Sequence, residues 1–219
     1  MTIWLDYLAR FAGQELEDHR GISPHAGLKL LAVKAAQRVL RRQYRRMSEA
    51  IGNAPHELPD QNELRDLAAP WFHSRLNGGE GDMLVGKALW AHKRKKAHMI
   101  CELSPYACMP NTMSIGAMAG VLGKYPEILY APLEIKGDAE VHALSRCQMV
   151  LTEARRRAQT EFEEVLEQTG LDADSARERL EALPQAARAT WPVPRRGATG
   201  TAANLVLHLA GMRYRASAA

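Results

Sequence analysis

The chain has 219 residues, of which 46% are hydrophobic and 25% are charged, and its formal net charge is +4. These values are ordinary for a globular protein of one or two domains with a sizeable core. No run of eighteen apolar residues occurs, and the first ten residues lack the apolar centre of a signal peptide. We therefore expect a cytoplasmic protein without a membrane span.

Residues 1–75 are predicted to form a helical lead-in. Apolar residues recur at helical spacing from Trp4 to about Ile51, beside a solvated basic face. The turn-forming segment 21–28 divides this stretch into two helices. The proline-containing segment 52–61 ends the second helix before a short third helix at 62–72.

Strands and helices are predicted to alternate from residue 76 to 170. A glycine-rich turn at 78–81 opens a helix, HMICEL at 98–103 resembles a buried strand, and a helix follows at 112–125. A second strand is predicted at 127–135, and a long amphipathic helix at 138–170. This order is typical of a parallel α/β unit. Residues 171–219 are predicted to be C-terminal helices that pack on it.

The loop at 104–111 is the strongest candidate site because it leaves the first predicted strand and enters a helix. Ligands of open parallel sheets bind beyond the carboxyl ends of the strands. The partial positive charge of the helix N-terminus suits an anionic cluster or a phosphate. Cys108 lies in this loop, Pro110 stiffens the helix entry, and Asn111 is a possible cap.

The three cysteines, at positions 101, 108 and 147, form an odd set without an export signal, which argues against a disulfide framework. Thiolate is the usual ligand of iron–sulfur clusters, but six residues separate Cys101 from Cys108, which is not the spacing of a zinc knuckle. The spacing leaves open whether these two are ligands or a buried strand cysteine and an incidental loop cysteine. Cys147 is interpreted as a small apolar residue of the long helix.

Several segments resemble the carboxyl-terminal part of the 2-hydroxyacyl-CoA dehydratase and (R)-2-hydroxyglutaryl-CoA dehydratase activator family. They are GEGDMLVGKA, MICELSPYACMPNTMS, YAPLEIKGDAEVHALSR and GATGTAANLVLHLA, and the likeness covers about 71–210. In that family a glycine–glutamate–glycine element precedes a strand, and a Cys-x-Pro-Asn loop contributes a cluster cysteine. Gly79, Glu80 and Gly81 match the first element, and Cys108, Pro110 and Asn111 match the second.

The resemblance implies a partial flavodoxin-like or Rossmann-like sheet that holds a [4Fe-4S] or related iron–sulfur cluster for low-potential electron transfer in anaerobic metabolism. It implies Cys108 as a metal ligand and Cys101 as a second one. A cubane needs three or four protein ligands, so we expect the chain to be a subunit or fragment that works with an ATPase activator domain or a dehydratase subunit. An acyl-CoA is a possible ligand, and the chain alone is not expected to be an active enzyme.

Further residues at the same edge are expected to position substrate or cluster. By resemblance Glu80 faces the cysteine loop with Gly79 and Gly81, although a helix N-terminal acid that complements the dipole is the simpler interpretation. Lys136 and Asp138 follow the second strand, where Asp138 also suits a helix cap.

Two other functions are compatible with the sequence. One is an α/β docking domain that binds a partner subunit without metal. The other is nucleic-acid binding by the basic helix around Arg41 to Arg46, which neither interleaved aromatic residues nor a known motif supports.

Overall fold

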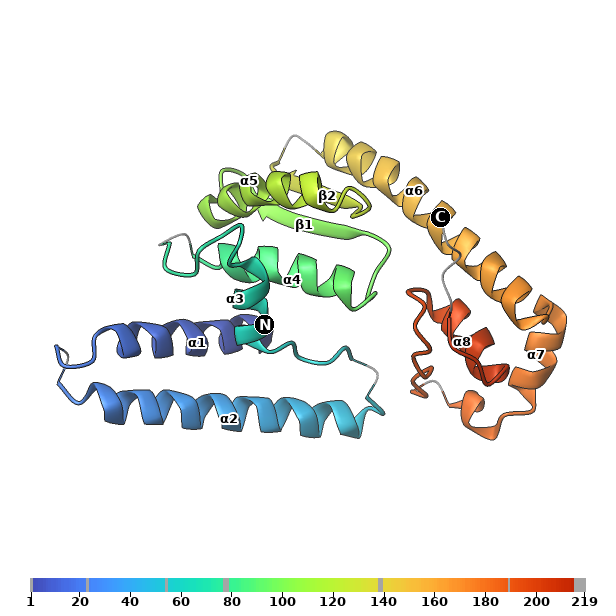
Figure 1. The fold of residues 1–219 in the computed structure, drawn as a ribbon, viewed down its shortest axis with the longest axis horizontal. Coiled ribbons are helices and arrows are strands. Elements are labelled where there is room, and N and C mark those ends of the chain that lie inside the picture. Colours follow the sequence, from blue (N-terminus) through green and yellow to red (C-terminus); the bar gives the residue numbers. More distant parts are fainter. Residues whose placement is uncertain are drawn as a thin grey trace.

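The computed structural model describes residues 2–22, 24–53, 55–76, 79–137, 140–188 and 190–214. This part of the chain is mostly helical and contains a two-stranded parallel sheet (Figure 1). None of its helices is both long and apolar enough to cross a membrane. The elements are α1 (Thr2–Asp18), α2 (Ala26–Ala50), α3 (Gln61–Ala68), α4 (Gly81–Lys93), β1 (Ile100–Pro105), α5 (Met109–Lys124), β2 (Tyr130–Ile135), α6 (Glu140–Thr169), α7 (Ala173–Glu181), a 3₁₀ turn (Pro184–Ala187) and α8 (Thr201–Leu209).

The predicted order of elements is confirmed, and the boundaries differ by a few residues. Asp60 caps α3 by accepting hydrogen bonds from the amides of Asn62 and Glu63. Strand β1 runs two residues further than expected and includes Pro105. A proline is tolerated there because it is the last ladder residue, after which the Tyr106 amide donates to the Ile135 carbonyl.

The sheet gives the structure its α/β character. Strands β1 and β2 pair in parallel with Ile100 opposite Tyr130 and Pro105 opposite Ile135, and α5 makes the crossover. This unit confirms the mixed α/β class. Two strands in the described part of the chain do not by themselves define a flavodoxin-like or Rossmann-like sheet.

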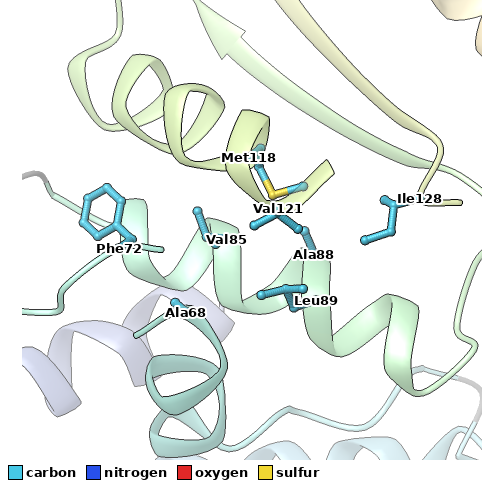
Figure 2. Close-up of a cluster of buried hydrophobic side chains, with 8 residues drawn as sticks. All are labelled: Ala68, Phe72, Val85, Ala88, Leu89, Met118, Val121 and Ile128. Atoms are coloured by element: carbon cyan, nitrogen blue, oxygen red, sulfur yellow. The ribbon is translucent and has the colours of Figure 1, made fainter. Parts of the chain in front are cut away.

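The main core lies between the sheet and helices α3, α4 and α5. Figure 2 shows its buried side chains, which come from these helices, from the turn after α3 and from the segment before β2. Ile100 and Tyr130 pack against this cluster from the inner face of the sheet. The core members are Ala68, Phe72, Val85, Ala88, Leu89, Met118, Val121 and Ile128.

Helix α1 packs against the other side of α4. Helices α1 and α2 form a long hairpin (Figure 1), and Tyr7 of α1 shares a second buried cluster with Leu64, Met83 and Trp90. Asp6 is fully buried and accepts hydrogen bonds from Gln37 and Arg41 of α2. Part of the basic face of α2 is therefore used to bind the hairpin together.

Helix α6 contacts β2 and then extends away from the sheet to α7 and α8 (Figure 1). Its far end forms a third buried cluster with these two helices, centred on Val165, Ala203 and Leu207. Glu161 links this region to the segment before β1, because its carboxylate accepts hydrogen bonds from His98 at 3.1 Å and from the Gly200 amide at 2.7 Å.

Candidate functional site

Cys108 lies where the sequence placed it, between the carboxyl end of β1 and the first turn of α5. It occupies the N-cap position with extended backbone, and its side chain makes no capping hydrogen bond. Its carbonyl accepts hydrogen bonds from the amide and hydroxyl of Thr112, both at 2.9 Å. The thiol is half-buried and remains available for another contact.

The glycine turn before α4 packs directly on this loop. Gly79 has φ +60°, and a Cβ atom there would lie 2.6 Å from Cγ of Pro110. At Gly81 a Cβ atom would lie 2.6 Å from the ring of Phe72. Glycine is needed at both positions for close packing, and at Gly79 also for the left-handed backbone. The structure thus brings together two of the four segments on which the family resemblance rests.

Glu102 fastens the start of α5 to the sheet. Its buried carboxylate accepts hydrogen bonds from Asn111 at 2.8 Å, from the Tyr130 hydroxyl at 2.6 Å and from the Ser114 hydroxyl. Burial and the bond to this carboxylate raise the pKa of Tyr130, so the phenol remains a donor. Asn111 therefore does not cap the helix with its side chain but ties it to β1.

A second anchor holds the glycine turn from α1. The Tyr7 hydroxyl donates to the Gly79 carbonyl at 2.6 Å, and Arg10 pairs with Asp82 at 2.6 Å with both side chains buried. Burial, with a smaller contribution from Asp82, raises the pKa of Tyr7 to about 12. Glu80 is the N-cap of α4, is half-buried and makes no side-chain capping bond.

The carboxyl end of β2 borders the loop on the other side. Glu134 accepts a hydrogen bond from the Ala107 amide at 3.0 Å, and Lys136 Nζ lies 5.5 Å from the centre of the Tyr106 ring. Lys136 is therefore beside the loop, as predicted. Asp138 lies outside the described residues.

Cys101 is not brought to this site. Residues alternate between the faces of a strand, and Glu102 faces α5, so Cys101 lies on the opposite, outer face. Its Cα also lies four residues before the end of β1, a span of about 13 Å along the strand. Burial, the nearby Cys147 thiol and a hydrogen bond to it raise the pKa of Cys101. Its neighbour is therefore Cys147 and not Cys108.

The loop with Cys108 lies where the first turns of two helices meet. The first turns of α4 and α5 lie side by side through the contact between Gly79 and Pro110, so two positive helix ends converge near Cys108. Among the described residues no group of three or more His, Cys, Asp or Glu side chains has the arrangement of a metal site. Within these residues the loop contributes one thiol, that of Cys108.

Sequence reasoning missed the residues that hold the site in place. Glu102 lies in an apolar strand, where a charged residue is unusual. Because carboxylates are rarely buried without partners, its presence there predicts buried hydrogen-bond donors nearby. Tyr7 and Arg10 gave no local signal, since their partners lie 72 residues further along the chain.

Comparison of the chain with protein-family models, with curated proteins and with solved structures gave no match. The family resemblance of the sequence therefore remains a prediction.

Proposed function

We propose that the chain is a cytoplasmic iron–sulfur module that takes part in low-potential electron transfer in a 2-hydroxyacyl-CoA dehydratase or activator system. The observation that carries the proposal is the position of Cys108, a free, half-buried thiol at two converging helix N-termini. An iron–sulfur cluster is anionic and takes thiolate ligands, so it suits this position.

In this proposal each part of the site has a separate task. Cys108 would bind iron, and the cluster would accept and release single electrons. Pro110 and Gly79 fix the loop by direct packing, and Asn111, held by Glu102, fixes the first turn of α5. A rigidly held loop keeps the metal-binding residue in place, so less structural rearrangement accompanies electron transfer. Residues around other metal sites fix the metal ligands in the same way.

The remaining ligands would come from a partner, such as an ATPase activator domain or a dehydratase subunit. Cys101 lies on the outer face of β1 and is not part of the same ligand set. A partner strand beside β1 would also extend the two-stranded unit toward a flavodoxin-like or Rossmann-like sheet, because an isolated two-stranded sheet is marginal. Glu80 and Lys136, which flank the loop, would then border any bound acyl-CoA.

The test is anaerobic reconstitution with iron and sulfide in the presence of the partner. We expect stoichiometric iron and sulfide and a broad visible absorption, lost in Cys108→Ser and kept in the matched control Cys147→Ser. Circular dichroism confirms that both variants fold. A colourless complex, or one whose cluster survives Cys108→Ser, would overturn the proposal.

A second candidate is a metal-free docking domain, and the outer face of the sheet favours it. Leu103 is 65% exposed, Ile135 is 51% exposed and Leu144 of α6 is 56% exposed, whereas parallel sheets are normally covered on both faces. If this candidate is correct, Leu103→Glu abolishes co-purification with the partner, while Cys108→Ser changes neither co-purification nor metal content.

A further inference from the structure

The outer face of the sheet carries a pair of thiols that the proposed cluster site does not use. Cys101 lies on β1 directly opposite Ala131 of β2, and α6 packs in contact with β2. Cys147 of α6 lines an apolar cavity of about 450 Å³ together with Leu133 of β2. The Cys147 thiol contributes, after burial, to the raised pKa of Cys101, which is consistent with the two thiols being neighbours on this face.

Both thiols can be reached and α6 has room to adjust. Cys101 is exposed and Cys147 is half-buried. Around Cys147 the long helix is held lightly, because its neighbours Leu144 and Met149 are 56% and 72% exposed. Cys147 also belongs to the stripe of α6 that faces the sheet, four residues from Ala143, which lines the same cavity.

We propose that Cys101 and Cys147 form a redox-active pair that a small-molecule disulfide such as glutathione disulfide closes into an intramolecular disulfide between β1 and α6. This site is independent of the proposed function, because it does not include Cys108.

The chemistry balances in two exchange steps. The thiolate of Cys101, the more exposed thiol, attacks the small disulfide, forming a mixed disulfide and releasing one small thiolate. The thiolate of Cys147 then attacks the Cys101 sulfur and releases the second. The two cysteines lose two protons and two electrons, and the small disulfide is reduced to two thiols. A dithiol reductant reverses both steps.

The closed form would fix the first half of α6 on the sheet. Bond formation brings the two sulfurs to about 2.05 Å, which draws α6 toward β1 and narrows the cavity beside Leu133. The oxidised and reduced proteins would therefore present different outer faces to any partner.

The test uses the full chain, reduced and then incubated with excess glutathione disulfide. Alkylation followed by mass spectrometry counts the thiols. The reduced chain has three, and we expect the oxidised chain to keep only Cys108. Peptide mapping should find one crosslink between residues 101 and 147, which dithiothreitol removes. Cys108→Ser should form the same crosslink, whereas Cys101→Ser and Cys147→Ser should form none.

Denatured protein provides the decisive control. In an unfolded chain the short loop between Cys101 and Cys108 closes more readily than the long loop to Cys147, so urea should move the crosslink to residues 101 and 108. Folded protein that links Cys108, that yields only mixed disulfides or intermolecular dimers, or that shows no crosslink would overturn the proposal.

Discussion

The Glu102 network offers the sharpest test of how the cysteine loop is held. Replacing Glu102 by Ala removes the acceptor of Asn111, Ser114 and Tyr130. Ser114 keeps another acceptor, because its hydroxyl also donates to the Asn111 carbonyl at 2.9 Å. Two donors are then left without a partner, at about 1–3 kcal/mol each. We expect Glu102→Ala to lower the free energy of unfolding by about 3 kcal/mol.

Urea denaturation followed by circular dichroism measures this loss from the shift of the midpoint at an unchanged slope. Tyr130→Phe removes one donor and leaves Glu102 with two, so it should cost about 1 kcal/mol. The matched control is Glu134→Gln, an exposed carboxylate with one bond to the loop, which should cost less than about 0.5 kcal/mol. A loss for Glu102→Ala no larger than that of this control would refute the reasoning.

Three further outcomes follow from other contacts. Gly79→Ala should destabilise the protein by about 2 kcal/mol, because alanine disfavours the left-handed backbone and its Cβ atom would overlap Pro110. Gly116→Ala, where the added Cβ atom points into open space on α5, should stabilise the protein slightly. Equal denaturation midpoints for the two variants would contradict this expectation. Burial raises the pKa of Glu161, but His98 and two backbone amides outweigh it and hold that pKa at about 2. Because the pKa of Glu161 is lower in the folded protein than the value of 4.5 for the unfolded chain, the ionised carboxylate stabilises the fold at pH values above about 4.5. About 3 kcal/mol of the free energy of unfolding should be lost as the pH falls from about 4.5 to 2. Glu161→Gln should flatten this dependence of stability on pH, and Glu167→Gln should not. Oxidation of the outer-face thiol pair should stabilise the chain by roughly 4 kcal/mol through loop closure, seen as a higher melting temperature that dithiothreitol reverses.

The helices, the strands and their order follow from local patterns in the sequence. Hydrophobic periodicity, prolines and caps act over a few residues, so the two strands, the crossover helix and the break between α1 and α2 could all be predicted. The same local signals place Cys108 at the junction of β1 and α5. The carboxyl end of a strand and the start of a helix are both visible in the residues around it.

The contacts between side chains from distant segments depend on how the elements pack in three dimensions. The contact of Gly79 with Pro110 and the bond from Tyr7 to Gly79 join segments separated by many residues, and no local pattern encodes such pairings. The alternation of β1 separated Cys101 from Cys108, because register and packing choose which face of the strand turns to α5. The same orientation of β1 places Cys101 beside Cys147. The helical pattern of the sequence identified Cys147 only as an apolar position.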